Sequence, residues 1–361
     1  MKLLFSPLLL RLAIIGLPLL IVVSCKKNDS APPPTAPAVT TTALTNITTS
    51  SATTGGTILT NGNAAITQSG IVWSKTNATP TLTDSVIAGT TASGSFVTNL
   101  TGLDFNTVYY IRAFATNSVG TGYGDVVKLN TANDTSKVRF TYNGKEVIYG
   151  IIISSVTGKK WLDRNLGATQ AASASDDYKG YGDLFQWGRP ADGHQLINWT
   201  SSTTGTPVNG TTTVLATSDT PGHSNYIIPP YQAPWILDWR SDNNMNRWAT
   251  NPQGPCPAGW HVPTIDEWLA ETSKTKGGTA NTGGMTQSSD AYSQLKLTVS
   301  GTRAVDGPGS VSIGLVGVAG LYWSSSLNND PMSKDFEFYI DALSPFQDFK
   351  STAKSVRCLI N

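Results

Sequence analysis

The chain has 361 residues, of which 14% are charged, and its 25 basic and 24 acidic residues give a formal net charge of +1. This balance provides no basic surface of the kind that non-specific nucleic-acid binding requires. A hydrophobic content of 39% is too high for a disordered chain and three cysteines are too few for a disulfide scaffold, so the length predicts two or three folded domains.

Residues 1–24 are expected to be an export signal. They combine positive charge with an apolar run of 12 residues, 12–23, which is shorter than the roughly 18–20 residues that a membrane-spanning helix needs. The run ends in VVSC, which resembles the lipobox of bacterial lipoproteins. The resemblance implies cleavage before Cys25, lipid attachment to its thiol, and an outer-membrane or cell-surface location. Residues 25–37 would then be a lipidated cysteine with a proline-rich tether.

Residues 38–131 contain short runs of alternating apolar residues between glycine and asparagine turns. This spacing predicts an antiparallel β-sandwich. The expected strands cover residues 38–43, 52–60, 69–75, 94–100, 107–117 and 123–130. Along the fifth of them, a period of two places Tyr109, Ile111 and Ala113 on one face.

The segment LDFNTVY, residues 103–109, resembles the tyrosine corner of fibronectin type III domains. The resemblance implies that the Tyr109 hydroxyl bonds the backbone near Leu103 while its ring enters the core. Trp73 is expected to be a core residue as well. We therefore expect residues 38–131 to form a fibronectin-like spacer, followed by a linker at residues 132–137.

Residues 138–361 hold nine of the ten tryptophans and several motifs. The motifs are KWLDRNLGA (160–168), YGDLFQWGR (181–189), CPAGWHVPTIDEW (256–268), YWSSS (322–326) and SVRC (355–358). In this order they resemble the Fibrobacter succinogenes major paralogous domain, a family that looks related to C-type-lectin-like folds. The chain is thus expected to be multidomain, with an all-β immunoglobulin- or fibronectin-like sandwich followed by an α+β C-type-lectin-like domain.

Two cysteines remain if Cys25 is lipidated. Cys256 and Cys358 would either form a disulfide in an oxidising compartment or stay as two buried thiols. The family resemblance implies that they pair. Close to the first of them, Thr264 and Glu267 have the spacing of a capping box, which predicts that a helix begins there.

Residues 195–250 form an aromatic-rich insertion in this domain. Its candidate ligand-binding residues are Trp199, Tyr231, Trp235, Trp239 and Trp248. Aromatic rings on loops, among amides and hydroxyls, suit stacking on sugar faces, and the alternative is that they form a small core of the insertion. Asp238 and Asp242 lie in an oxygen-rich run and are candidate ligands for calcium, with a polar turn as the alternative.

The sequence contains no zinc-binding histidine spacing, nucleophile elbow or phosphate-binding loop, so no catalytic residue and no cofactor besides calcium is predicted. We expect a non-enzymatic lipoprotein, anchored in the outer membrane by its lipid, that presents a binding domain for glycans. One alternative is an adhesin or accessory subunit that binds other proteins in a cell-surface complex. A third is an unrecognised carbohydrate-active enzyme, because paired carboxylates can lie far apart in a chain.

Overall fold

The computed structural model describes residues 32–361 except for 90–92, 231–237, 243–246, 273–283 and 329–331. The expected signal segment and Cys25 lie outside the described residues. The chain divides into two compact units, Met1–Asn133 and Asp134–Asn361. Among the described helices, none is long and apolar enough to cross a membrane.

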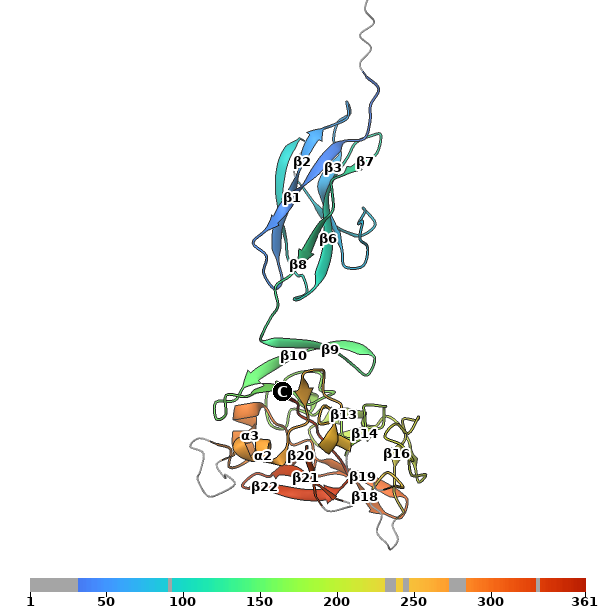
Figure 1. Ribbon diagram of the computed structural model, residues 1–361, viewed down its shortest axis with the longest axis vertical. Helices are drawn as coiled ribbons and strands as arrows, with labels where there is room; N and C mark the ends of the chain where they lie inside the picture. The colour runs from blue at the N-terminus through green and yellow to red at the C-terminus, as the bar shows by residue number, and fades with distance from the viewer. Residues whose placement is uncertain (1–31, 90–92, 231–237, 243–246, 273–283, 329–331) are drawn as a thin grey trace, which may run out of the picture. The chain divides into compact units, whose positions relative to one another are not determined.

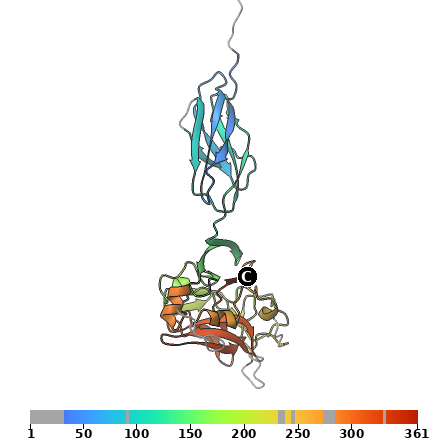
Figure 2. The ribbon, with the colours of Figure 1, turned by 60° about the vertical axis from the view of Figure 1, so that its left-hand side comes forward.

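The N-terminal unit is an all-β sandwich of antiparallel strands (Figures 1 and 2). Its strands are β1 (Ala38–Thr45), β2 (Ala52–Thr60), β3 (Gln68–Ser74), β4 (Ser85–Ala88), β5 (Gly94–Leu100), β6 (Val108–Thr116), β7 (Thr121–Tyr123) and β8 (Val127–Asn130). One sheet has the order β1-β2-β5, and the other has the order β4-β3-β6-β7, with β8 also paired to β6. The predicted sandwich is therefore confirmed.

Two details of the strand prediction were wrong. The expected strand at residues 123–130 is divided into β7 and β8, because the register against β6 changes between the pairs Phe114–Tyr123 and Ile111–Val127. The edge strand β4 was not predicted. Only one of its four residues is even partly buried, so it lacks the apolar alternation that reveals the other strands.

The tyrosine corner is present. Tyr109 is buried between the sheets, and its hydroxyl oxygen accepts a hydrogen bond from the backbone amide of Asp104 at 2.8 Å. The half-buried Trp73 packs edge-on against the Tyr109 ring, with the ring centroids 5.4 Å apart. The hydroxyl thus fixes the 103–109 segment to the core that its own ring helps to fill.

Replacing Tyr109 with phenylalanine should therefore lower the free energy of unfolding of the N-terminal unit by about 1 kcal/mol, because the Asp104 amide loses its acceptor while the ring stays in the core. Calorimetric thermal unfolding of the full chain would measure the loss. The matched control is Tyr110→Phe at the neighbouring, half-buried tyrosine, which should change the transition little. Equal effects of the two variants would contradict the structural role of the Tyr109 hydroxyl.

The C-terminal unit is mainly β-structure with short helices. Its strands are β9 (Lys137–Tyr142), β10 (Lys145–Ile153), β11 (Lys160–Leu162), β12 (Phe185–Gln186), β13 (Ile197–Ser201), β14 (Thr204–Pro207), β15 (Thr211–Thr212), β16 (Tyr226–Ile227), β17 (Trp260–His261), β18 (Thr302–Gly307), β19 (Ser310–Gly314), β20 (Gly320–Leu327), β21 (Met332–Phe338), β22 (Leu343–Phe349), β23 (Ala353–Lys354) and β24 (Leu359–Ile360). Its helices are the 3₁₀ turn η1 (Tyr178–Gly180), α1 (Arg247–Thr250), α2 (Ile265–Ala270) and α3 (Ser288–Leu295).

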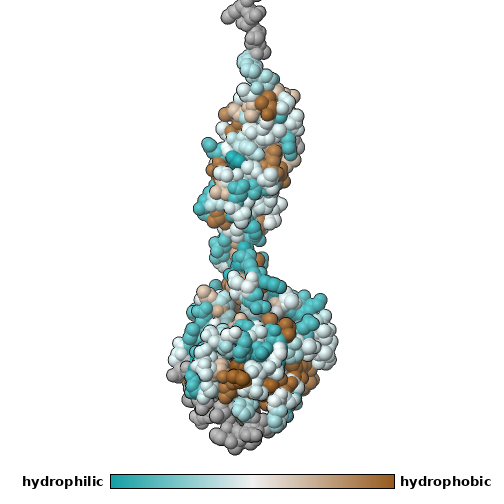
Figure 3. Space-filling model, turned by 90° about the vertical axis from the view of Figure 1, so that its right-hand side faces the viewer, coloured by the Kyte–Doolittle hydropathy of each residue, from teal (hydrophilic) through white to brown (hydrophobic). Residues whose placement is uncertain are grey.

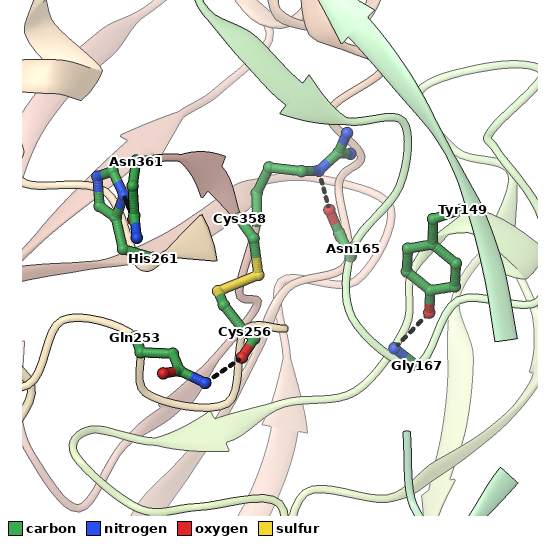
Figure 4. Close-up of a disulfide and its surroundings, with 9 residues drawn as sticks. Tyr149, Asn165, Gly167, Gln253, Cys256, His261, Cys358 and Asn361 are labelled. Atoms are coloured by element: carbon green, nitrogen blue, oxygen red, sulfur yellow. Dashed lines mark hydrogen bonds between the residues drawn. A yellow bond between two sulfur atoms is a disulfide. The ribbon is translucent and has the colours of Figure 1, made fainter. Parts of the chain in front are cut away.

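Segments from the two ends of this unit meet in one sheet, whose order is β17-β24-β11-β10-β9. A disulfide joins Cys256, just before β17, to Cys358, just before β24 (Figure 4). The disulfide expected from the family resemblance is therefore present. It ties together strands that the sheet also holds side by side.

Helix α2 begins with the predicted capping box. The Thr264 side chain accepts from the Glu267 amide, and the Glu267 carboxylate accepts from the Thr264 amide. The helix buries Trp268, whose ring stacks on Phe336 of β21 with the centroids 4.8 Å apart. This contact fixes α2 against the sheet β20-β21-β22 and forms the centre of one of the unit's cores.

Candidate functional site

A cavity of about 840 Å³ lies in the C-terminal unit, lined by the β9–β10 hairpin and by residues of the β13–β14 hairpin. Apolar side chains form much of its wall, and the rim residues Val208 and Ile148 are 57% and 39% exposed. Figure 3 shows that apolar residues form small patches among hydrophilic ones on one face of this unit. We call this space the Asp183 cavity, because it contains a single carboxylate.

Asp183 is buried in the cavity lining. Its Oδ2 accepts a hydrogen bond from the Tyr142 hydroxyl at 2.7 Å, and its Oδ1 accepts one from the Ile197 amide at 3.3 Å. Burial raises the pKa of the Asp183 carboxyl to about 7, and the two hydrogen bonds oppose that rise only in part. The carboxyl therefore changes its charge near neutral pH.

The segment beside Asp183 is held by Tyr149 and by a glycine. The Tyr149 hydroxyl accepts from the Gly167 amide at 3.0 Å (Figure 4) and donates to the Ala168 carbonyl oxygen at 3.3 Å. Gly167 has φ +84°, and a Cβ there would lie 2.3 Å from Asp183 Oδ2. Only glycine allows the backbone to approach the carboxylate so closely.

A second, smaller cavity of about 280 Å³ adjoins the first one. The two share five lining residues, which are Gly167, Ala168, Thr169, Ile197 and Asn198. Two half-buried aromatic rings, Trp199 and Tyr178, line the second space, which we call the Trp199 cavity. Together the two cavities contain aromatic rings, exposed amide and hydroxyl groups, and the Asp183 carboxylate.

Trp199 is held in place by its hairpin. Its indole nitrogen donates to the Gly182 carbonyl oxygen at 2.6 Å, and its ring meets Tyr181 edge-on with the centroids 5.1 Å apart. Trp199 pairs with Gly205 across the hairpin, where a Cβ would lie 2.4 Å from the indole ring. Glycine at this position leaves room for the ring to lie across β14. Of the predicted aromatic candidates, Trp199 is thus placed on a cavity.

Two other candidates are buried, which corrects the prediction for them. Trp239 is fully buried, its indole nitrogen donates to the Trp187 carbonyl oxygen at 2.7 Å, and the Arg247 guanidinium lies 4.6 Å from its ring centroid. Trp248 is 3% exposed and packs in a core with Trp187. Burial of large rings stabilises the insertion itself, so the fully buried Trp239 is not available for stacking on a ligand. Trp248 lines a separate cavity of about 290 Å³, where almost all of its surface is buried. Tyr231 and Trp235 lie outside the described residues.

The candidate calcium ligands Asp238 and Asp242 both form ion pairs. Asp238 is fully buried and forms an ion pair with Arg247, while Asp242 forms one with Arg240. Guanidinium groups therefore take the carboxylate oxygens that a calcium ion would need. Within the described ranges, no group of three or more histidine, cysteine, aspartate or glutamate residues could hold a metal ion.

A separate cluster of charges is buried beneath the sheet β20-β21-β22. Lys354 is fully buried and contacts Asp335, Glu337 at 2.9 Å and Asp348 at 3.0 Å. Burial raises the pKa of Asp335 to about 7, although Lys354 favours its ionised form. One ammonium thus compensates three carboxyls from two strands, which makes Lys354 a structural cross-link.

Among the described residues that line the two cavities, Asp183 is the only carboxylate, whereas most glycoside hydrolases use a pair. Two of the histidines have structural partners: His194 is buried against Asp192, and His261 bonds Glu267 at 3.0 Å. The site combines a cavity, apolar walls and one buried carboxylate, Asp183, that accepts hydrogen bonds.

Several of these residues were not identified from the sequence. Asp183 lies in the YGDLFQWGR motif, where one acid among apolar residues is a signal of a buried carboxylate, but the motif was interpreted only as a sign of the fold. Tyr142, Tyr149 and Tyr178 come from separate segments. No spacing along the chain relates them to Asp183 or to Trp199.

Comparisons with known proteins add no identification. No protein-family model matches the chain, and no curated protein is significantly similar to it. The sensor domain of the anti-sigma factor RsgI4 from Pseudobacteroides cellulosolvens is similar over 28% of this chain and 98% of that domain, with 12% identity and a TM-score of 0.22. A crystal structure of titin domains is similar over 28% of this chain and 32% of that one, with 18% identity and a TM-score of 0.21.

Proposed function

We propose that the chain is an outer-membrane or cell-surface lipoprotein, anchored through Cys25, whose C-terminal unit binds glycans without catalysis. The anchor is supported by the VVSC sequence at the end of a short apolar run. The observation that carries the binding function is the position of Trp199 on a cavity that adjoins the Asp183 cavity.

The N-terminal unit serves in this proposal as a fibronectin type III-like spacer. Its support is the pairing of a three-stranded sheet with a sheet built around β3 and β6, together with the hydrogen bond of Tyr109 to the Asp104 amide. Its interior is filled by its own side chains, such as Ile71 and Leu129. A unit of this kind separates a binding domain from its anchor.

The C-terminal unit is proposed to be a C-type-lectin-like domain of the Fibrobacter succinogenes major paralogous family. Three features support this: the motifs in the chain, the meeting of β11 and β24 in one sheet, and the disulfide between Cys256 and Cys358. The family likeness carries no ligand with it. The ligand class is argued from the cavities alone.

Glycans fit the Trp199 cavity for chemical reasons. A sugar ring presents an apolar face that packs on aromatic rings, and its hydroxyls bond amides and hydroxyls at the edge. Trp199 and Tyr178 provide the rings, while the exposed Asn198 and Thr169 provide polar groups beside them. The shared lining connects this surface to the larger cavity, so more than one sugar unit can be accommodated.

A glycan array probed with the full chain in detergent tests this function, and calorimetric titration would then give the affinity for a glycan found there. Replacing Trp199 with alanine should weaken binding about tenfold or more, because the variant loses both the apolar area that the ring buries and an aromatic contact of about 1 kcal/mol, and a loss of about 1.4 kcal/mol is already tenfold. Trp199→Phe should retain part of the affinity. Phe346→Ala removes a 59% exposed ring that lines neither cavity and should leave binding unchanged.

Two outcomes would contradict the proposal. Absence of glycan binding by the folded chain, or binding that Trp199→Ala and Phe346→Ala weaken equally, would remove its support. Thermal unfolding of each variant shows whether the domain is intact. The half-buried position of Trp199 makes this check necessary.

A further inference from the structure

The Asp183 cavity combines apolar walls with one buried carboxylate, and sugar binding does not explain this combination. Its walls include Val147, Leu196, Pro207 and Val208, and it contains one buried carboxylate. Its volume of about 840 Å³ lies in the range of small-molecule sites. Apolar walls around one acid suit a ligand that has an aliphatic stem and a single charged end.

Asp183 retains capacity to accept hydrogen bonds. A carboxylate offers about four acceptor positions, and each oxygen of Asp183 accepts one bond, from the Tyr142 hydroxyl or from the Ile197 amide. In the part of the chain that the structure describes, no ion pair includes Asp183. Its charge, when present, therefore lacks a protein cation in contact.

The described cations that line the cavity do not form ion pairs with Asp183, and its buried tyrosines carry no charge. The Arg164 guanidinium lines the cavity but is bound to the Asp163 carboxylate at 2.7 and 2.9 Å, so its charge is neutralised locally. Lys145 is exposed at the start of β10, where water screens it. Tyr142 and Tyr149 are buried and uncharged at neutral pH, because burial raises the pKa of both phenols.

We propose that the Asp183 cavity binds a primary ammonium group carried on an aliphatic stem. The stem packs against the apolar walls, and the ammonium donates hydrogen bonds to the free acceptor positions of Asp183. This chemistry occurs in the lysine side chains of proteins and in free alkylamines. The inference concerns the larger cavity and does not depend on glycan binding at Trp199.

The proposal has a consequence for pH dependence. Burial raises the pKa of Asp183 to about 7, so the carboxyl is mostly neutral at pH 5.5 and mostly ionised at pH 8.5. An alkylammonium keeps its charge up to about pH 10. Ammonium binding should therefore strengthen as the pH rises through 7, and the binding of a neutral ligand should not.

The experiment is calorimetric titration of the full chain with pentylamine and with 1-pentanol, which has a similar stem and no charge. At pH 8.5 pentylamine should bind about tenfold or more tightly than pentanol, because a hydrogen bond to a charged partner is stronger than a neutral one. The difference should largely disappear at pH 5.5. Similar affinities for the two ligands at pH 8.5 would overturn the proposal.

Amino-acid substitutions test whether Asp183 causes the preference for pentylamine over pentanol. Asp183→Asn should remove the preference for pentylamine, whereas Asp341→Asn, an exposed acid away from the cavity, should keep it. Val208→Lys adds a cation at the exposed rim without disturbing a buried residue, and it should weaken pentylamine binding more than pentanol binding. Retention of the full preference in Asp183→Asn or in Val208→Lys would overturn the proposal.

The same titration distinguishes the two sources of the ligand. Nα-acetyl-lysine amide is compared with Nα-acetyl-norleucine amide, which lacks the ammonium. If the lysine derivative binds about tenfold or more tightly, the cavity accepts lysine side chains of a protein partner. If pentylamine alone shows the preference, the cavity is restricted to free amines. Either result supports ammonium recognition, and a preference in neither pair overturns it.

Discussion

Replacement of Lys354 by methionine is expected to destabilise the C-terminal unit by about 3–5 kcal/mol, because the variant leaves Asp335, Glu337 and Asp348 without their shared cation. The loss should be larger at pH 8.5 than at pH 5. The raised pKa of Asp335, about 7, means that this carboxyl is already protonated in the folded state at pH 5. The Lys354 ammonium lowers the pKa of Asp335, so without it this carboxyl is harder to ionise, and the folded variant loses further stability as the pH rises above 7.

Urea unfolding followed by tryptophan fluorescence measures this effect, because nine of the ten tryptophans lie in the C-terminal unit. Lys334→Met is the matched control. Lys334 lies on the same sheet but is half-buried, and its loss should cost much less. If both variants lose the same free energy, or if the Lys354→Met penalty does not grow with pH, the cluster does not have the role assigned to it.

Removing the disulfide by the double replacement Cys256→Ala and Cys358→Ala should cost the C-terminal unit about 4–5 kcal/mol by the chain-entropy argument, since the bond closes a loop with a sequence separation of 102 residues. The same fluorescence-detected unfolding gives the value. Dithiothreitol should destabilise the unmodified chain by a similar amount and leave the variant unchanged. An unaltered midpoint in reducing conditions would show that the sheet alone holds β17 and β24 together.

The parts of the fold that were predicted correctly depend on local patterns. Alternation revealed the sandwich strands because each carries one buried face, and Thr264 with Glu267 marked the start of α2 because a capping box lies within four residues. β4 lacks a buried face and was missed for that reason. Such signals are contained in a few neighbouring residues.

The site could not be predicted in the same way. The Asp183 cavity is built from four segments, 142–149, 164–169, 183 and 196–208, and only the tertiary fold brings them together. A tryptophan is also ambiguous in a sequence, because the same large ring suits a core and a sugar platform. Trp239 and Trp199 both belong to the aromatic-rich insertion, yet Trp239 is fully buried and Trp199 lines a cavity.

The order of the sheet β17-β24-β11-β10-β9 has a consequence for how the C-terminal unit folds. Trp161 of β11 pairs locally with Ile152 of β10, but its partner on the other side is Leu359 of β24, which is synthesised after nearly all of the unit. Contacts between such distant residues slow folding, because a long loop must close before any pairing is gained. Until then one edge of β11 lacks its pairing partner, and an unpaired strand edge is open to aggregation.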